Sequence, residues 1–304
     1  MKSAAIVSRQ GLGDGLIMMI CAYHLKKTGY HVTFFHNSFH ELEHFFKNYS
    51  FERMPNKIED LLSFDLLFIE YFNNPLIESI LKHRALFKRI FIIYPTLNKK
   101  HLPRVPCDFV FDKKISMIEN ITKTMAAILN AIVKKSNGIT PPSDLIHNKN
   151  KKRVVIHPTS LDKSKNWRKK RFIKLFEKVR ALGYDPIFSL SKTEADQWTD
   201  EKIPIVSFNN FHDLASFIYE SGYLIGNDSG PAHLASNLQI PTLVIASNKR
   251  TMKLWKPDFY KSEVITASCL IPNIKMLRIR NKYWAYFIST KKVLRRFLKI
   301  CSKE

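Results

Sequence analysis

Residues 226–235, Gly226-Asn227-Asp228-Ser229-Gly230-Pro231-Ala232-His233-Leu234-Ala235, predict the end of a strand, a turn and the start of a helix. The apolar residues 223–225 before them are typical of a short buried strand. Pro231 is expected in the first helical turn, where its missing N–H costs nothing, and Asp228 or Ser229 is expected to cap the helix. Free N–H groups and the positive end of the helix dipole would then converge on one point. This arrangement favours an anion, most often a phosphate; the alternative is an ordinary capped turn between a strand and a helix.

The composition indicates a globular chain with room for two domains. Its 304 residues are 45% hydrophobic. No apolar run approaches the roughly 18 residues that a membrane-spanning helix needs. Residues 1–7 lack the full apolar core of a signal peptide and predict a first strand. The cysteines are scattered without metal-ligand spacing, which is typical of buried thiols in a reducing cytoplasm; they are Cys21, Cys107, Cys269 and Cys301.

The formal net charge of +23 predicts an acidic partner, which could be a nucleic acid, an anionic lipid or a phosphorylated glycan. The excess is uneven, because residues 249–304 hold fifteen Lys or Arg against Asp258, Glu263 and Glu304. Part of the excess has a simpler explanation in a general enrichment of lysine. Nucleic-acid binding is disfavoured, since the chain has no motif in which aromatic residues alternate with arginine.

The first half of the chain predicts an open, mostly parallel α/β sheet. Residues 4–8 form a strand signal, 11–15 a glycine loop, 16–27 a helix and 31–35 a second strand, which together make a βαβ unit. Leu16 stands where a dinucleotide fingerprint would need its third glycine, so that function is excluded here. Two apolar runs predict further buried strands, and two longer segments predict helices; these are 66–69 and 89–93, and 75–88 and 116–135.

The second half repeats the alternation of strands and helices after a linker at 136–143. The clearest helix follows Trp167, with one apolar face made of Phe172, Leu175, Phe176, Val179 and Leu182. Strands are predicted at 154–156, 186–190, near Ile205, at 223–225 and at 242–246, and helices near Glu194 and at 212–221. We therefore predict two domains, residues 1–147 and residues 148–304, each with a parallel sheet.

The last helix, predicted at about 283–301, has two contrasting faces. The apolar stripe is Tyr283, Tyr286, Phe287, Leu294, Phe297, Leu298 and Cys301, and the basic arc is Lys291, Lys292, Arg295, Arg296 and Lys299. Such a helix either packs on the domain with its basic face in water or lies on an anionic membrane surface.

Three motifs of the chain resemble those of family 9 glycosyltransferases, the lipopolysaccharide heptosyltransferases. Residues 228–235 resemble the nucleotide-sugar motif, His157-Pro158-Thr159-Ser160 followed by Lys165-Asn166-Trp167 resembles the motif upstream of it, and Gly13-Asp14 matches near the N-terminus. The resemblance covers residues 151–250 and, more thinly, 1–35. It implies an α/β protein of the GT-B type, with two Rossmann-like parallel-sheet domains facing across a cleft. The N-terminal domain would present the acceptor, and the C-terminal domain would bind the nucleotide sugar.

The predicted nucleotide-sugar residues come from both C-terminal motifs. Thr159 and Ser160 follow the strand at 154–156 and offer hydroxyl and N–H groups to a diphosphate. Lys165 can neutralise the charge that develops on the leaving diphosphate. Ser229 and Gly230 offer N–H groups at a helix start to the same diphosphate.

Three further roles are implied by the resemblance. Asp228 would contact the sugar, His233 would lie near the phosphates, and Glu194 would bind the ribose hydroxyls. Each has a structural alternative: His233 could be an ordinary buried histidine and Glu194 a helix-capping carboxylate.

The resemblance also implies that Asp14 is the base that takes the proton of the acceptor hydroxyl during direct, inverting displacement. A cap of the glycine loop is the alternative role. Gly15 departs from the family, which usually has an apolar residue there. The chain contains no Asp-x-Asp sequence, so we predict no metal and no cofactor.

The resemblance, together with the basic surface, implies a bacterial, cytoplasmic, inverting and metal-independent glycosyltransferase of lipopolysaccharide biosynthesis. It would move heptose from ADP-heptose to a hydroxyl of an anionic lipopolysaccharide core, in peripheral contact with the anionic inner-membrane surface and without nucleic acid. The alternatives are another nucleotide sugar, a protein acceptor, a non-catalytic binder of sugar nucleotides, or, less in keeping with the motifs, a nucleic-acid-binding protein.

Overall fold

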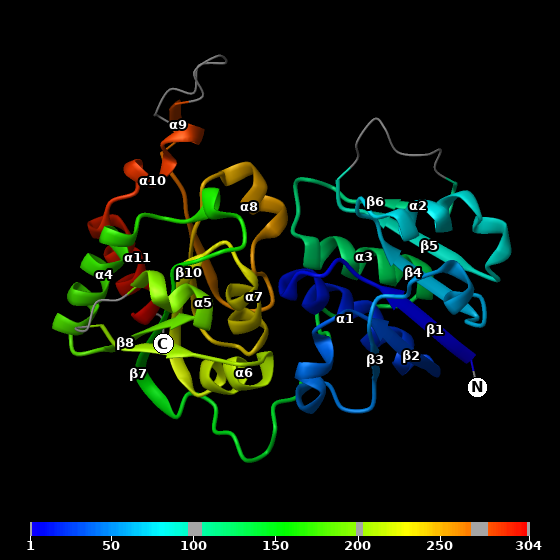
Figure 1. Cartoon of the computed structure of the whole chain (residues 1–304), viewed down its shortest axis with the longest axis horizontal. Coiled ribbons are helices and arrows are strands. Elements are labelled where there is room, and N and C mark those ends of the chain that lie inside the picture. Colours follow the sequence, from blue (N-terminus) through cyan, green and yellow to red (C-terminus); the bar gives the residue numbers. More distant parts are fainter. Residues whose placement is uncertain (1, 97–104, 199–202, 269–278, 303–304) are drawn as a thin grey trace. The chain divides into compact units, whose positions relative to one another are not determined.

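The computed structural model describes residues 2–96, 105–198, 203–268 and 279–302. It divides into two compact units, Met1–Thr140 and Pro141–Glu304. Each unit holds one six-stranded parallel sheet flanked by helices (Figure 1). The predicted α/β class with two Rossmann-like sheets is confirmed.

The first sheet has the strand order β3-β2-β1-β4-β5-β6. Its central strands β1 (Lys2–Val7) and β4 (Leu66–Glu70) lie side by side, although an α-helix, two strands and two 3-10 helices lie between them in the chain. The order reverses at this pair, and such a reversal leaves a crevice beyond the carboxyl ends of the strands. The other elements are β2 (Tyr30–Phe35), η1 (Phe39–Phe45), β3 (Ser50–Glu52), η2 (Ile58–Leu61), α2 (Pro75–Lys82), η3 (Arg84–Leu86), β5 (Ile90–Tyr94), β6 (Phe109–Val110) and α3 (Met117–Leu129).

The glycine segment of the first unit is helical earlier than predicted. Helix α1 (Leu12–Lys27) begins within the predicted loop, and Gly11 is its extended N-cap residue. Asp14 therefore lies in the first helical turn, where a carboxylate interacts favourably with the positive end of the helix dipole. The helices at 75–88 and 116–135 are shorter than predicted, because α2 ends at Lys82 and α3 at Leu129, followed by the left-handed Asn130.

The second sheet has the order β12-β11-β10-β7-β8-β9, which is the same topology counted from β7. The reversal here lies between β7 (Asn150–His157) and β10 (Ser221–Asn227). The other elements are η4 (Lys163–Lys165), α4 (Lys169–Ala181), β8 (Asp185–Leu190), α5 (Lys192–Ala195), η5 (Asp196–Trp198), β9 (Ile205–Ser207), α6 (Phe211–Tyr219), α7 (Gly230–Asn237), β11 (Thr242–Ile245), α8 (Lys249–Trp255), β12 (Ser262–Ile265), α9 (Ile279–Lys282), α10 (Trp284–Phe287) and α11 (Thr290–Cys301).

The predicted apolar face of α4 is confirmed at four of its five positions. Phe172, Leu175, Phe176 and Val179 are buried in the core of the second unit, where Phe172 packs edge-on against Trp167. Leu182 is the exception, since it follows the helix as its C-cap residue and is about half exposed.

The prediction of a single helix at 283–301 is wrong. The chain forms α10 and α11 with a break at Ile288 and Ser289, where Ile288 is extended and its carbonyl accepts hydrogen bonds from Trp167 Nε1, at 3.0 Å, and from Arg171. The predicted stripe is confirmed in part. Phe297 is buried, and Phe287, Leu294 and Cys301 pack partly buried against the core, whereas Tyr283, Tyr286 and Leu298 are exposed. Val293 and Ile300 complete the buried face.

Two smaller observations bear on the predicted surroundings of the chain. None of the helices in the described ranges is both long enough and apolar enough to cross a membrane. Cys21 is buried and Cys107 and Cys301 are partly buried, while Cys269 lies outside the described residues.

Candidate functional site

The candidate site of the second unit lies where β7 and β10 end. These strands pair in parallel up to His157 and Gly226, so the loops after them start side by side. Gly226 is required at this position, because a Cβ atom there would lie 2.7 Å from the His157 carbonyl oxygen. The two motifs found in the sequence are therefore brought together at the reversal point of the sheet, as parallel α/β topology predicts.

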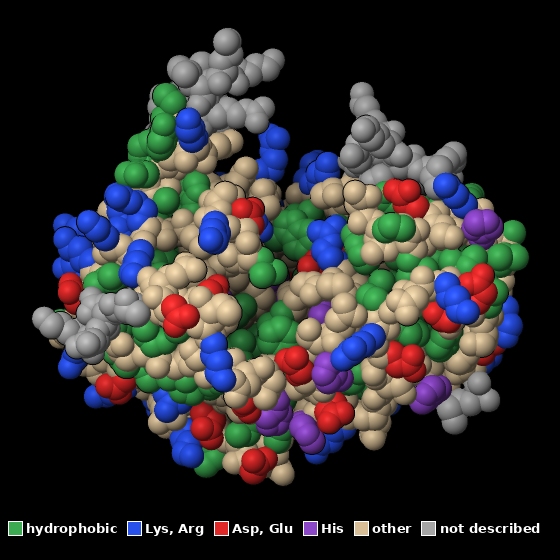
Figure 2. Space-filling view, in the orientation of Figure 1, with side chains coloured by type: hydrophobic (Ala, Val, Ile, Leu, Met, Phe, Trp, Pro, Cys, Tyr) green, Lys and Arg blue, Asp and Glu red, His purple; other side chains and the backbone are tan. Residues whose placement is uncertain are grey.

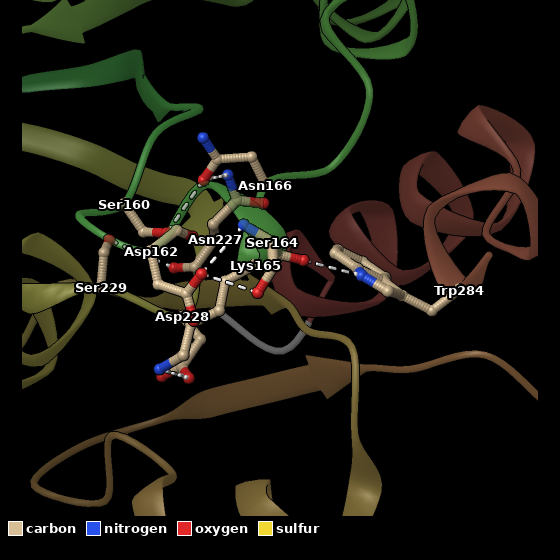
Figure 3. A network of polar contacts seen from close by, with 9 residues as sticks. All are labelled: Ser160, Asp162, Ser164, Lys165, Asn166, Asn227, Asp228, Ser229 and Trp284. Carbon is tan, nitrogen blue, oxygen red and sulfur yellow. Dashed lines mark hydrogen bonds and ion pairs between the residues drawn. The ribbon is translucent and has the colours of Figure 1, made fainter. Parts of the chain in front are cut away.

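Asn227 ties the two loops to each other (Figure 3). Its Oδ1 accepts a hydrogen bond from the Trp167 backbone N–H at 3.0 Å, and its Nδ2 donates to the Pro158 carbonyl and, at 3.4 Å, to Asn166 Oδ1. Asn227 is fully buried, so each lost bond would leave a desolvated polar group. This residue fixes the course of the 158–167 loop under the start of α7.

The loop 158–167 is further ordered by short hydrogen bonds. The Ser160 hydroxyl donates to the Asp162 carbonyl at 2.7 Å and to Asn166 Oδ1 at 2.9 Å. Asp162 caps η4 by accepting from the Ser164 N–H and hydroxyl, and this lowers the pKa of its carboxyl. Trp284 of α10 donates from Nε1 to the Ser164 carbonyl at 3.0 Å (Figure 3). Ser160, a predicted diphosphate ligand, therefore already donates its hydroxyl hydrogen bond within the loop.

Lys165 and Asp228 form the charged centre of the site. Lys165 Nζ lies 3.0 Å from Asp228 Oδ2, and the side chains are 40% and 12% exposed. His233, on the buried side of α7, interacts electrostatically with both residues. Burial lowers the pKa of His233 to about 4; the negative charge of Asp228 opposes this shift, and the positive charge of Lys165 adds to it. His233 Nδ1 is buried and has no hydrogen-bond partner in the described part of the chain. His233 is therefore neutral at pH 7.

The start of α7 has no side-chain cap from the predicted residues. Ser229 is the N-cap residue, yet its hydroxyl donates to the Asn227 carbonyl at 3.3 Å and makes no capping hydrogen bond within the described ranges. Asp228 is drawn to Lys165 instead. The prediction that one of these side chains caps the helix is therefore wrong. Pro231 lies in the first turn as predicted, and Gly230 is the first helical residue.

Thr159 and Glu194 meet at one edge of the same site. Glu194 closes a capping box with Ser191, accepting from its N–H at 2.9 Å and from its hydroxyl at 2.7 Å. Burial would raise the pKa of Glu194, but these bonds and the nearby Thr159 hydroxyl lower it. The Thr159 hydroxyl is buried and forms no hydrogen bond within the described residues. Glu194 is therefore an ionised carboxylate next to a predicted diphosphate residue, and it also has the capping role that was the alternative.

Asp14 belongs to the first unit, where it lies in the first turn of α1. Its Oδ2 lies directly over Gly11, where a Cβ atom would approach it to 2.4 Å. Gly15, the departure noted in the sequence, faces Phe39: a Cβ atom at Gly15 would lie 2.4 Å from that ring. Phe39, supplied by the segment after β2, thus fills the space that a larger side chain at position 15 would take.

Sequence reasoning missed the residues that hold the site together. Asn227 and Asn166 stood inside the quoted motifs without a role, and Trp284 lies far along the chain. A buried asparagine at the end of a buried strand was a usable signal, whereas nothing in the pattern around Trp284 indicated its contact. Among the described residues, no group of three or more His, Cys, Asp or Glu side chains is arranged to hold a metal ion.

Residues 124–268 match the family model described as glycosyltransferase family 9 (heptosyltransferase). The matched range includes every predicted nucleotide-sugar residue and excludes Asp14. The resemblance predicted from the motifs is therefore confirmed, and so is the enzyme class, glycosyltransferase.

Solved structures share the fold along the whole chain. A family 9 glycosyltransferase of Veillonella parvula has 15% identity and a TM-score of 0.73, with 100% of this chain and 98% of that chain covered. The E. coli ADP-heptose lipopolysaccharide heptosyltransferase II has 11% identity and a TM-score of 0.70, with 100% and 99% covered. E. coli heptosyltransferase WaaC with ADP has 10% identity and a TM-score of 0.67, with 98% and 99% covered. A search of curated proteins gave no match.

Proposed function

Starting from the family 9 match of residues 124–268, we propose that this glycosyltransferase transfers heptose from ADP-heptose to a hydroxyl of an anionic lipopolysaccharide core. The donor proposal is supported by two solved structures of the same fold, the E. coli ADP-heptose lipopolysaccharide heptosyltransferase II and the E. coli heptosyltransferase WaaC with ADP. The reaction would invert the anomeric centre and need neither metal nor cofactor.

The proposal rests mainly on the groups that surround Lys165 at the end of the second sheet. A cation, a helix start without a side-chain cap and the neutral His233 lie together at the reversal point of a parallel sheet. Such a set suits a diphosphate: Lys165 would exchange Asp228 for a phosphate oxygen, and Gly230 would offer a backbone N–H. Asp228, released from Lys165, would be available to the sugar hydroxyls.

The remaining donor contacts follow from the other edge of the site. The Thr159 hydroxyl, which has no hydrogen-bond partner among the described residues, would donate to the diphosphate, and the Ser160 hydroxyl would turn to it from Asn166. The ionised Glu194 would accept hydrogen bonds from the ribose hydroxyls. Ser160 and Glu194 currently bond within the unit, so for them binding exchanges existing hydrogen bonds for new ones of similar strength.

In the transfer itself, Asp14 would act as the base. The acceptor oxygen attacks the anomeric carbon from the face opposite the diphosphate, and its proton passes to the Asp14 carboxylate. The bond from carbon to the diphosphate oxygen breaks as the new bond forms, and the electron pair leaves with ADP. Lys165 would neutralise the negative charge that grows on this leaving group.

Contact with an anionic surface is proposed for the face made by α4 and α11, which pack together. Figure 2 shows Lys and Arg side chains gathered in the region of α4. The exposed basic residues of the two helices are Lys169, Lys170, Lys174, Lys178 and Arg180, and Lys291, Lys292, Arg295 and Lys299. We propose that this face holds the enzyme at the cytoplasmic side of the inner membrane, where the acceptor is made.

A ligand panel read by thermal shift tests the donor. Ligands that bind only the folded state raise the unfolding midpoint by mass action. We expect ADP and ADP-heptose to raise it, and UDP, GDP and their sugars to leave it unchanged, with and without EDTA. Stabilisation by UDP or GDP compounds alone would overturn the donor. A requirement for a divalent ion would overturn metal independence.

A transfer assay separates an enzyme from a non-catalytic binder. The protein is incubated with ADP-heptose and a lipopolysaccharide core acceptor, and release of ADP is compared with formation of the glycosylated acceptor. Equal amounts of both products support the proposal. Binding of ADP-heptose without either product would identify a sugar-nucleotide binder.

A further inference from the structure

Glu70 is a fully buried acid at the reversal point of the first sheet. It is the last residue of β4, adjacent to the end of β1, and its side chain has no exposed surface. The sheet order β3-β2-β1-β4-β5-β6 makes this the edge at which ligands of such folds bind. Burying an ionised carboxylate is costly unless its oxygens are well satisfied, so the position calls for a reason.

The two oxygens of Glu70 have different surroundings. Oε2 accepts the Arg9 backbone N–H at 3.1 Å and the Ser8 hydroxyl at 3.4 Å. Oε1 is buried and has no hydrogen-bond partner among the residues that the structure describes. An ionised Glu70 would leave a charged Oε1 buried without a donor, which costs more than burying a neutral carboxyl, so this geometry favours the protonated form.

The charged neighbours favour the same state. Burial, and then the charge of Asp14, raise the pKa of Glu70 to about 8, against the opposing effects of the Arg9 charge, the Arg9 N–H and the Ser8 hydroxyl. On the α1 side, the Cys21 thiol is also buried, and its pKa is raised by burial and then by Glu70. On the β5 side, the buried Tyr94 packs in the core cluster of Leu67 and Ile69, on the face of β4 opposite to Glu70. At pH 7 the Glu70 carboxyl therefore keeps its proton.

We propose that Glu70 is a positioning residue that holds a proton beside Asp14, so that the pair carries a single negative charge and that charge is on Asp14. The proposal rests on the proposed role of Asp14 as the base, because a base must be ionised before the acceptor arrives. Repulsion between two negative charges would disfavour that state, and the neutral Glu70 removes it. The two carboxyls would titrate as a coupled pair.

The pH dependence of folding stability tests whether Glu70 is protonated, and it needs no assay of function. The pKa of Glu70 is raised in the folded state from 4.5 to about 8, so the stabilisation is complete below pH 4.5 and is lost as the pH rises through 8. Glu70→Gln cannot ionise and loses nothing. The folding equilibrium constant of wild type should therefore fall relative to Glu70→Gln, by up to about tenfold per pH unit between pH 5 and 8.

Glu119→Gln is the matched control, since Glu119 is an acid of the same unit that pairs with Lys123 at 3.3 Å on the surface. We expect its stability curve to run parallel to that of wild type. Parallel curves for wild type and Glu70→Gln would overturn the proposal. Should Glu70→Gln not fold, NMR titration of ¹³C-labelled glutamate carboxyls in wild type decides it: a carboxyl titrating near pH 8 supports the proposal, and its absence overturns it.

The pH profile of transfer tests the link to Asp14. In wild type we expect kcat/KM to change near pH 8 as Glu70 ionises, and in Glu70→Gln this inflection should vanish while the rate at pH 7 stays within about tenfold. A residue that only supports the fold would leave the profile unmoved, and that result would overturn the positioning role. If wild type shows no transfer at all, the proposed function is contradicted. The stability curves would still show whether Glu70 is protonated in the folded state.

Discussion

Lys165 Nζ lies 3.0 Å from Asp228 Oδ2, and this contact joins two loops that are 63 residues apart in the chain. The pair is partly exposed, so it contributes no more than about 1 kcal/mol to stability. The fold does not depend on it, since Asn227 already fixes the two loops. A cation held in place by a carboxylate that can let it go is well suited to an incoming anion.

Lys165→Ala should therefore damage function more than stability. We expect transfer to fall by roughly 10²–10³-fold, the usual cost of removing one group that stabilises charge in the transition state. The unfolding free energy should change by less than about 1 kcal/mol. Steady-state kinetics and urea unfolding measure the two effects. Lys163→Ala, in the same short helix and exposed, is the control and should change neither.

Asn227→Ala should have the opposite profile. The substitution removes the partners of the buried Trp167 N–H and of the Pro158 carbonyl, at a cost of about 2–4 kcal/mol in unfolding free energy. Asn248→Ala, which removes an ordinary cap of α8, should cost about 1 kcal/mol. Equal losses in urea unfolding would show that Asn227 does not tie the loops together.

The sequence predicted what depends on local pattern and missed what depends on partners far along the chain. The apolar face of α4 and the alternation of strands and helices follow from periodicity, and both are present. The break between α10 and α11 arises because the Ile288 carbonyl is bound by Trp167 and Arg171, more than a hundred residues away. No window of sequence contains that information.

The candidate site divides along the same line. The pairing of two motifs at one sheet edge was predictable, because strand ends converge in a parallel sheet. The partners of individual side chains were not: Ser229 was expected to cap a helix and bonds to Asn227 instead. The burial of Glu70 at the end of an apolar strand could not be predicted, since it depends on α1 and on the segment after β1.

Asp14→Asn should reduce turnover by roughly 10²–10⁴-fold, the usual contribution of a general base, because an amide cannot accept the acceptor proton. Affinity for ADP should stay close to that of wild type, since the proposed donor residues all belong to the second unit. Glu119→Gln, in the first turn of α3, is the control for loss of an acid at a helix start. Near-normal turnover in Asp14→Asn would leave Asp14 with a structural role only.

Gly15→Ala should destabilise the first unit, although alanine normally favours a helix by up to about 1 kcal/mol over glycine. The new methyl group would lie 2.4 Å from the buried Phe39 ring, and such overpacking typically costs about 1–3 kcal/mol. Thermal unfolding of Gly15→Ala and of the double variant with Phe39→Leu measures the effect. We expect the smaller leucine to recover part of the loss that alanine causes. A stabilised Gly15→Ala would contradict the close packing at this position.

The basic face of α11 gives the last prediction. Lys291, Arg295 and Lys299 are exposed and spaced one helical turn apart, whereas Lys292 donates to the Thr266 carbonyl and Arg296 pairs with Glu263. Changing the first three to Gln should weaken binding to anionic vesicles by at least about tenfold at low salt, since each charge near such a surface contributes about 1 kcal/mol.

The fold should tolerate this triple change, because Val293, Phe297 and Ile300 remain buried on the other side of the helix. A charge-matched control replaces Lys47, Lys82 and Lys114, exposed lysines of the first unit, with Gln. We expect the control to bind vesicles like wild type, and high salt to weaken all binding by screening. Vesicle sedimentation measures the affinities. If the α11 variant and the control lose affinity equally, the attraction comes from net charge alone and the α4–α11 face has no special role.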